Sequence, residues 1–441
     1  MAIIAQKQIF GWNEIDGLGD LERLRLVVEY MPDEKLMRYL ESGRKHGRDD
    51  YPVRAVWNAI LAGVVFGHNS VESLRRELLR NAQLRQVCGF DVAKGDLSVP
   101  SRFAFTRFLR KLMMHQDLVD GIFDDLLDEL AVELEGFGTR LACDGKAIRS
   151  HGRKRAKDAP SEADGRRDID ADIGVKTYHN ARKDCSVWLR TMKWFGYKLH
   201  LIVDSDYELP VAYELTKASI AEQPTAHHML DELNERHPEL LNKCEYFSAD
   251  KGYDDGKLTR RLWDDYQIIP VIDIRDMWSG SDEPTRPLDG SFDLVQDYRG
   301  TISCCCRSTG ELRQMPYGGF EADRETLKFL CPARHYGIDC PDTENCSVNH
   351  SIRVPLSQDR RRFGPLPRAS AKWQREYKKR NAAERVNSRL DVSFGFERHF
   401  IRGKKKMKLR CSLALITMLA MALGRIRENQ PENIRSLVRA A

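Results

Sequence analysis

Residues 139–148 read TRLACDGKAI, and residues 244–250 read CEYFSAD. Each stretch is a short apolar run of the kind that forms a buried strand, and each carries an aspartate where the run ends, Asp144 and Asp250. In an open sheet, neighbouring parallel strands present their carboxyl ends at one edge, where ligands bind. The sequence therefore predicts that these two aspartates meet at one edge of a sheet.

The surrounding sequence predicts the rest of an α/β core. Two β-rich runs within 193–219 are separated by a turn and predict a hairpin. Within 221–274, two helical patterns alternate with the strand at 244–250 and a last apolar run, QIIPVIDI. The predicted order is β, β, β, α, β, α, β, and the polar stretch 149–182 is interpreted as a long loop or a partly disordered hairpin.

Before this core, residues 20–134 have apolar positions three and four apart, as in VRAVWNAILAGVVFG (53–67), which predicts a unit of short helices. One predicted helix, SRFAFTRFLRKLM (101–113), carries four basic residues: Arg102, Arg107, Arg110 and Lys111. Such a helix docks on DNA in helix-turn-helix proteins, and ordinary helix packing explains the pattern equally well. Both interpretations follow from the pattern.

A third acid, Glu384, lies in KWQREYKKRNAAERVNSRLDVSFG (372–395), a run rich in helix-forming Arg, Lys, Glu and Ala. A helix packed across the sheet edge would bring this carboxylate to Asp144 and Asp250. Three converging carboxylates suit Mg²⁺ or Mn²⁺, which prefer oxygen ligands in octahedral geometry. Two such ions about 3.5–4 Å apart activate an attacking oxygen and stabilise the leaving one in phosphodiester chemistry.

The chain resembles the DDE transposases of bacterial insertion sequences in three motifs that occur in the same order: DGKAIR (144–149), ADKGYDD (249–255) and YKKRNAAE (377–384). The last motif fits that family's signature of Tyr, two residues, Arg, three residues and Glu. The resemblance extends over most of the chain. It implies an α/β fold whose catalytic core is RNase H-like, a mixed sheet flanked by helices.

With this resemblance the chain divides into four parts. Residues 1–135 are expected to form an all-helical DNA-binding domain, and residues 136–274 the first part of the RNase H-like core. Between 275 and 370 the periodicity is lost and Gly, Pro, Asp and Cys become frequent, which predicts an irregular Cys-rich insertion. Residues 371–441 are expected to complete the core with helices that carry the third acid.

The resemblance implies that Asp144, Asp250 and Glu384 ligate two Mg²⁺ or Mn²⁺ ions, and that Tyr377 and Arg380 contact DNA near the cleaved end. Positions 377, 380 and 384 share one face of a helix, which supports the assignment independently. Neighbouring cations are expected to hold the DNA strand: Lys378, Lys379, Arg385 and Arg389.

Several nearby residues leave alternatives open. The family often has Lys or Arg seven positions after the Glu, where this chain has Asp391, so that Arg385 and Arg389 are the residues able to substitute. Lys146 and Lys251 either contact the phosphate or screen the carboxylates. Two further acids, Asp254 and Asp255, compete for the second ligand position, and Asp250 is preferred because it directly ends the apolar strand.

The charge of the 441-residue chain is concentrated in one segment. The net charge is only +5, yet residues 351–410 hold 19 Lys or Arg against 5 Asp or Glu, and the rest of the chain is net negative. A concentrated positive face attracts phosphate backbones, which favours a nucleic-acid partner over an ordinary solvated surface.

Six of the eleven cysteines fall between 304 and 346. The predicted structural zinc site takes one thiol from positions 304–306, assigned to Cys306, with Cys331, Cys340 and Cys346; it would fold the insertion and take no part in cleavage. No Cys-x2-Cys pair occurs. Reduced thiols without metal and regulatory disulfides are the alternatives.

The leading hypothesis is a transposase that binds the terminal inverted repeats of its element as a homodimer on double-stranded DNA and catalyses strand cleavage and transfer into target DNA. The alternatives are an RNase H-like nuclease without strand transfer, and a DNA-binding repressor or inactive copy. The first residues show no targeting pattern, so a cytoplasmic, nucleoid-associated protein with no membrane partner is expected. The longest apolar stretch, 411–424, is short for a membrane span, which needs about 20 residues, and predicts a buried core helix.

Overall fold

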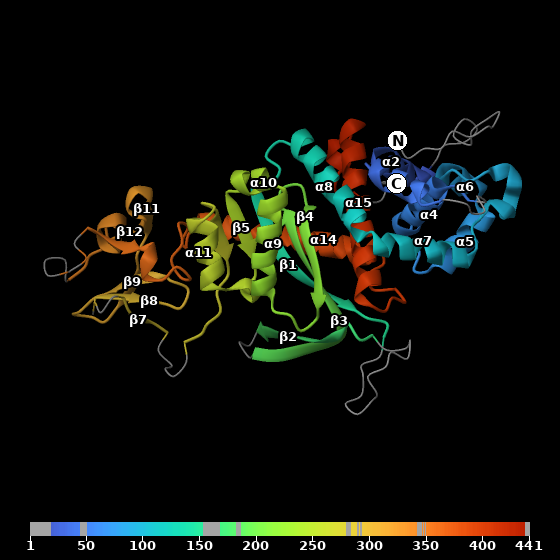
Figure 1. Ribbon diagram of the computed structural model, residues 1–441. Coiled ribbons are helices and arrows are strands. Elements are labelled where there is room, and N and C mark those ends of the chain that lie inside the picture. The colour runs from blue at the N-terminus through green and yellow to red at the C-terminus, as the bar shows by residue number, and fades with distance from the viewer. Residues whose placement is uncertain are drawn as a thin grey trace, which may run out of the picture.

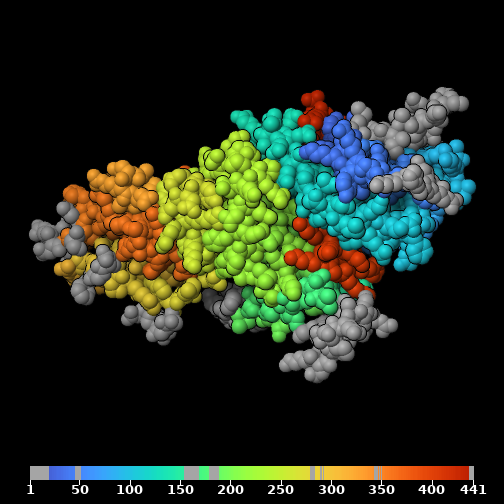
Figure 2. All heavy atoms as spheres, viewed as in Figure 1, coloured from blue at the N-terminus to red at the C-terminus, as the bar shows by residue number. Residues whose placement is uncertain are grey.

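The computed structural model describes residues 19–44, 51–152, 168–181, 187–278, 284–288, 291, 293–341, 346, 348 and 350–436. Figure 1 shows an elongated molecule in which a helical unit and a small β-rich unit lie at opposite ends of a central sheet with its helices. The space-filling view has the same order, with the N-terminal elements at one end and the 290–340 region at the other (Figure 2).

The helical unit is built from short amphipathic helices. Its elements are η1 (Gly19–Leu21), α2 (Glu22–Tyr30), α3 (Glu34–Ser42), α4 (Val53–Val65), α5 (Val71–Arg80), α6 (Ala82–Cys88), η2 (Val92–Ser98), α7 (Arg102–Met114) and α8 (Gln116–Glu133). Serine side chains start two of them: Ser70 accepts from the Ser73 N–H at 3.1 Å and Ser101 from the Ala104 N–H at 3.2 Å. These N-caps satisfy backbone donors that the first helical turn leaves unpaired.

The central sheet mixes antiparallel and parallel pairing. Its strands are β1 (Arg140–Arg149), β2 (Asp172–Ala181), β3 (Val187–Asp204), β4 (Leu209–Lys217), β5 (Tyr246–Ala249) and β6 (Ile269–Ile272). The order across the sheet is β4-β3-β1-β5-β6, and β2 pairs with the first half of β3. β3 is antiparallel to its neighbours, whereas β1, β5 and β6 run parallel, so their carboxyl ends share one edge.

The structure differs from the sequence prediction at β2 and β3. β2 lies in the stretch interpreted as a long loop or a partly disordered hairpin, and its antiparallel pairing with the first half of β3 agrees with the second interpretation; β3 begins before the predicted run at 193. Ile173 and Val175 of β2 are exposed, so this pairing rests on backbone hydrogen bonds outside the core. A strand without a buried face lacks the alternating apolar pattern by which strands are predicted.

Helices cover both faces of the sheet. α9 (Glu222–Arg236), α10 (Pro238–Lys243), η3 (Lys251–Tyr253) and α11 (Gly256–Asp264) follow the strands in the first part of the core, and α13 (Ala371–Lys378), α14 (Asn381–Val392), α15 (Lys404–Arg427) and η6 (Pro431–Asn433) complete it. α14 packs on β1 and β3, and α9 contacts β3 and β4 (Figure 1). Alternate residues of β1 face these two helices, because successive side chains of a strand point to opposite faces.

α15 joins the core to the helical unit. It packs against α2, α4 and α8 and also against β4. By length and composition this helix could cross a membrane, but 89% of its most apolar window is buried inside the protein. That burial confirms the predicted core helix, because these side chains already have an apolar environment.

The 275–370 insertion is more regular than its sequence predicts. It forms a four-stranded sheet, β10-β9-β8-β7, and a three-stranded sheet, β11-β12-β13, around a small apolar core of its own. The elements are β7 (Arg286–Pro287), β8 (Leu294–Gln296), β9 (Ile302–Cys305), β10 (Leu312–Gln314), β11 (Tyr317–Glu321), η4 (Ala322–Arg324), β12 (Thr326–Leu330), α12 (Pro332–Tyr336), β13 (Ser351–Pro355) and η5 (Leu356–Gln358). Strands of two to five residues are too short to show a period, so the prediction of an irregular segment was wrong here.

Candidate active site

Asp144 and Asp250 are neighbours at the edge where β1 and β5 separate. The parallel pairing ends at Cys143 and Ala249, so these aspartates are the next residue on each strand. Asp250 follows the last residue of β5, as the sequence suggests. Asp144 instead lies inside β1, which continues to Arg149 along β3; what ends at Asp144 is the pairing with β5.

Burial and the neighbouring carboxylate change the chemistry of Asp144. Burial, and after it the negative charge of Asp250, raise the pKa of Asp144 to about 6. Lys176 and Arg380 act in the opposite direction but do not offset the burial. Two adjacent carboxylates of this kind are stabilised by a bound cation, which removes the repulsion between them.

Asp250 is held by the turn that follows β5. Its Oδ1 accepts a hydrogen bond from the Gly252 N–H at 2.7 Å, and Lys176 Nζ lies 4.0 Å from its Oδ2. The two competing acids have other partners. Asp254 is buried in ion pairs with Arg361, and Asp255 caps α11, so neither is available beside Asp144.

Helix α14 carries the third acid and contacts the first directly. Asn387 Nδ2 donates to Asp144 Oδ2 at 2.9 Å, and Glu384 lies one turn before Asn387 on the same face. Glu384 itself is 54% exposed and accepts a hydrogen bond from Arg380 at 2.6 Å. The structure thus brings the helix of Glu384 to the two aspartates, with the Glu384 carboxylate turned toward Arg380. Sequence reasoning missed Asn387, although its spacing of three from Glu384 was the available signal.

The two lysines that follow the aspartates are both paired with acids. Lys146 Nζ lies 2.5 Å from Asp391 Oδ2, with only 10% of the lysine side chain exposed. Lys251 Nζ lies 3.7 Å from Asp273, which directly follows β6. A positive charge therefore stands beside position 391, but it comes from β1 and not from α14.

Tyr377 and Arg380 lie beside this cluster. The Tyr377 ring stacks on Trp373, with ring centres 4.7 Å apart and planes 11° apart, and the Arg380 guanidinium lies 5.6 Å from the Tyr377 ring centre. Burial and the charge of Asp273 raise the pKa of Tyr377, so its hydroxyl is kept protonated. The Arg380 Nε is buried without a hydrogen-bond partner among the described residues.

The four other predicted DNA contacts have different surroundings. Arg385 and Arg389 both pair with the buried Glu208, at the start of β4, and Lys379 Nζ lies 3.3 Å from Asp206. These three ion pairs link α13 and α14 to the turn between β3 and β4. Lys378 is exposed and has no acidic partner within the part of the chain that the structure describes.

Several cysteines of the insertion lie close together: Cys304, Cys305, Cys306, Cys340 and Cys346 line one small pocket. Burial raises the pKa of Cys304 to about 11, and the thiols of Cys331, Cys346 and Cys340 are near enough to contribute to that shift. Cys306 is buried in the same region. Among the described residues, however, no three thiols lie within 4.8 Å of one another. The zinc site therefore stays a prediction.

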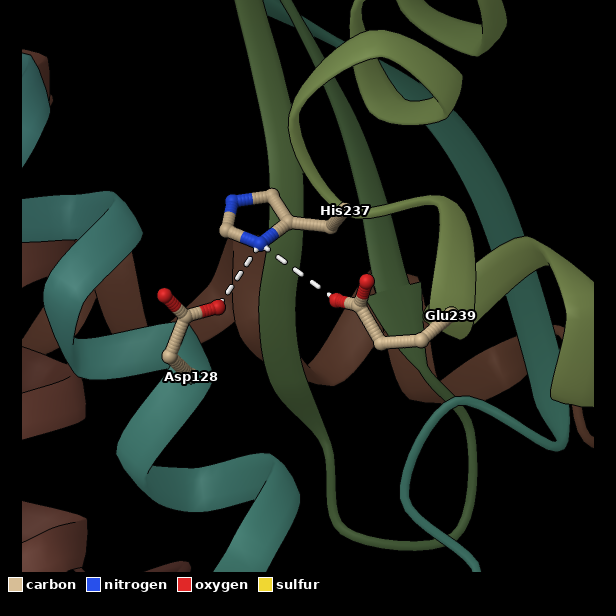
Figure 3. A group of neighbouring side chains, drawn as sticks. All are labelled: Asp128, His237 and Glu239. Atoms are coloured by element: carbon tan, nitrogen blue, oxygen red, sulfur yellow. Dashed lines mark hydrogen bonds and ion pairs between the residues drawn. The ribbon is translucent and has the colours of Figure 1, made fainter.

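One group elsewhere has metal-like spacing: Asp128, His237 and Glu239 (Figure 3). His237 Nδ1 lies 2.9 Å from Asp128 and Nε2 lies 3.2 Å from Asp124, so both ring nitrogens are within hydrogen-bond distance of a carboxylate. Burial opposes the charge of His237, but the hydrogen bond to Asp124 and the charges of Asp128 and Asp124 outweigh it and raise its pKa. An imidazolium satisfies this arrangement, and we interpret the group as an ion pair that ties α8 to α10.

A cavity of about 580 Å³ is formed by α4, α5, α7 and α15 together with the segment around Phe396, and none of the three predicted catalytic acids lines it.

The structure thus places two adjacent aspartates at one edge of a mixed sheet, with the helix of Glu384 beside them. A sequence profile described as transposase DDE domain matches residues 135–420, and one described as transposase domain DUF772 matches residues 14–111. The chain therefore belongs to the DDE transposases of insertion sequences.

Among solved structures, the chain is similar to the cryo-EM structure of a piggyBac transposase synaptic complex with hairpin DNA. The two are 12% identical, with 96% of this chain and 86% of that chain covered and a TM-score of 0.30. The family assignment does not rest on that similarity. A search of curated proteins found no match.

Proposed function

We propose that this transposase binds the terminal inverted repeats of its element and catalyses DNA strand cleavage and transfer at the Asp144, Asp250 and Glu384 edge. The observation that carries the proposal is the placement of Asp144 beside Asp250, with Asn387 of the Glu384 helix bonded to Asp144. The sheet order β4-β3-β1-β5-β6, with antiparallel strands first and parallel strands after, supports an RNase H-like core.

The residues at this edge fit Mg²⁺ or Mn²⁺. Their donors are carboxylate oxygens, which these ions prefer, and the buried Asp144 lies directly beside Asp250 at the end of the β1 and β5 pairing. When bound, divalent ions supply Lewis acidity to the phosphodiester and activate the attacking oxygen. Asp144 and Asp250 would hold them, and rotation of Glu384 away from Arg380 would complete the set.

The remaining residues of the site would position DNA. Arg380 offers a buried, unpaired N–H donor beside the acids, which suits a phosphate oxygen, and Tyr377 presents a ring fixed by Trp373. Substrate DNA that draws Arg380 toward its phosphate would release Glu384 at the same time. Cleavage first produces a 3′ hydroxyl, which then attacks target DNA within a protein dimer holding both ends.

Strand mapping tests the proposal. We expect the purified protein, incubated with the DNA that flanks its gene, to nick the element boundaries with Mg²⁺ and not with EDTA. Glu384→Gln should lower nicking at least 100-fold, whereas Glu397→Gln, an exposed acid on the same basic segment, should leave it unchanged.

The products separate the alternatives. Joined strands identify a transposase, and nicks without joining identify a nuclease. Specific binding with no nicks in the presence of both ends would contradict catalysis and identify a repressor.

A further inference from the structure

Two glycines flank the proposed catalytic aspartates, and one carboxylate occupies the space that their side chains would fill. Gly145 follows Asp144, and Gly252 lies two residues after Asp250. Neither has a positive φ, so backbone conformation does not require glycine at either position. A Cβ at Gly252 would lie 1.9 Å from Glu222 Oε2, and one at Gly145 would lie 3.2 Å from Glu222 Oε1.

Glu222 is therefore close to Asp250, and it also lies against Gly145, the residue that follows Asp144. The same Cβ position at Gly252 lies 2.8 Å from Asp250 Oδ1, so the Glu222 and Asp250 oxygens cannot be farther apart than the sum of the two distances. One divalent cation with oxygen ligands at about 2.0–2.6 Å spans a gap of that size.

The fold fixes Glu222 in this place. It is the first residue of α9, where the helix dipole favours an acid, and Lys198 Nζ lies 3.3 Å from its Oε1. Lys198 also donates to the Ile220 carbonyl at 3.0 Å, so the lysine is itself anchored. Both side chains are mostly buried, at 12% exposed for Lys198 and 18% for Glu222. The ion pair with Glu222 explains the position of Lys198. It does not explain why the Glu222 carboxylate lies against both Gly145 and Gly252.

We propose that Glu222 is a fourth carboxylate of the metal site, a ligand that shares a divalent cation with Asp250. This inference rests on the proposed function and extends it. Glu222 reaches the edge from the α9 face of the sheet, whereas Asn387, on the helix that carries Glu384, reaches it from the α14 face.

Mn²⁺ binding to the full-length protein without DNA, followed by electron paramagnetic resonance, tests the proposal without reference to activity. We expect Glu222→Gln to weaken Mn²⁺ binding by about 10-fold or more, as Asp250→Asn does. Gly252→Ala should have the same effect while Glu222 is intact, because the new methyl group displaces the carboxylate. Glu235→Gln, which removes an exposed acid from the same helix, should bind as the wild type does. Thermal unfolding of each variant verifies that it is folded.

The outcomes are separable. If Asp250→Asn weakens Mn²⁺ binding while folded Glu222→Gln and Gly252→Ala bind as the wild type does, Glu222 is only a partner of Lys198 and the inference is wrong. If the wild type binds no Mn²⁺, or Asp250→Asn binds it unchanged, the proposed metal site fails and the inference fails with it.

Discussion

Single residues around Asp144 show how the first strand and the third-acid helix are held in register. Asp144 and Lys146 lie on the same face of β1, and each contacts α14, through Asn387 and Asp391. At position 391 the family often has Lys or Arg, whereas this chain has the acidic Asp391. Lys146 forms an ion pair with Asp391 and supplies a positive charge beside it. The Lys146 and Asp391 pair thus supplies a cross-link that the family signature does not predict.

A double-mutant cycle measures this cross-link. We expect Lys146→Met and Asp391→Asn each to lower the free energy of unfolding by ~1–3 kcal/mol, with a coupling energy of ~1 kcal/mol or more, because the lysine is mostly buried. Urea unfolding gives these values. The exposed pair Lys35 and Asp125 serves as the control and should couple by less than ~1 kcal/mol. Additive effects at Lys146 and Asp391 would show that the contact does not stabilise the protein.

At the level of secondary-structure elements, the arginines of α14 have roles that their position in a basic segment does not reveal. Arg389 and Arg385 pair with Glu208, which is only 3% exposed at the β3–β4 turn. Such pairs orient the helix, because loss of either partner leaves a buried charge uncompensated. The high positive charge of 351–410 is therefore partly neutralised within the fold and does not form a uniform DNA-binding face.

His237 gives the junction of α8 and α10 a pH dependence. Its folded-state pKa is raised, so its contribution to stability is fully present below the unfolded value of about 6.5 and is lost as pH rises through the higher folded value. Besides Asp124, Asp128 and Glu239, the charged neighbour at this junction is Arg236.

Unfolding experiments between pH 5.5 and 9 check this expectation. The wild type should lose about 1.4 kcal/mol per unit of pKa difference across that window, and His237→Gln should remove this loss. His228→Gln, an exposed site on α9, is the control and should keep the wild-type slope. An unchanged pH profile in His237→Gln would rule out the ion pair.

Across the whole molecule, the clearest free positive surface is on α7, far along the chain from the predicted DNA contacts. Its four basic residues are exposed and have no acidic partner among the described residues: Arg102, Arg107, Arg110 and Lys111. α7 belongs to the helical unit at one end of the molecule (Figure 2). Exposed cations without acidic partners on one helix fit both interpretations that the sequence leaves open, DNA docking and ordinary helix packing.

Salt-dependent DNA binding tests this surface. Arg107→Gln with Arg110→Gln should weaken binding to the element ends and lower the slope of log K against log salt by about 1 for each lost phosphate contact. Arg427→Gln is the control that also removes a positive charge. Because the Arg427 side chain pairs with Glu129 and Glu133, this variant should leave the slope unchanged. An unaltered slope in the α7 variant would assign DNA contact to another surface.

The apolar runs that carry Asp144 and Asp250, the place of Asp250 at the end of its run, the helix of Glu384 and the burial of the last long helix could all be predicted from the sequence, because each depends on a local apolar pattern or on residues a few positions apart. Asp250 could be preferred over Asp254 on the same basis. Glu222, Asn387 and the pairing of Lys146 with Asp391 could not, because each contact joins segments far apart in the chain. The short strands of the insertion escaped prediction, and the exposed β2 was covered only by the hairpin alternative for 149–182, since neither has a period to detect. Which basic residues are free and which are paired is likewise set by packing, because the partner of a charge is chosen by the folded chain and not by its neighbours in sequence.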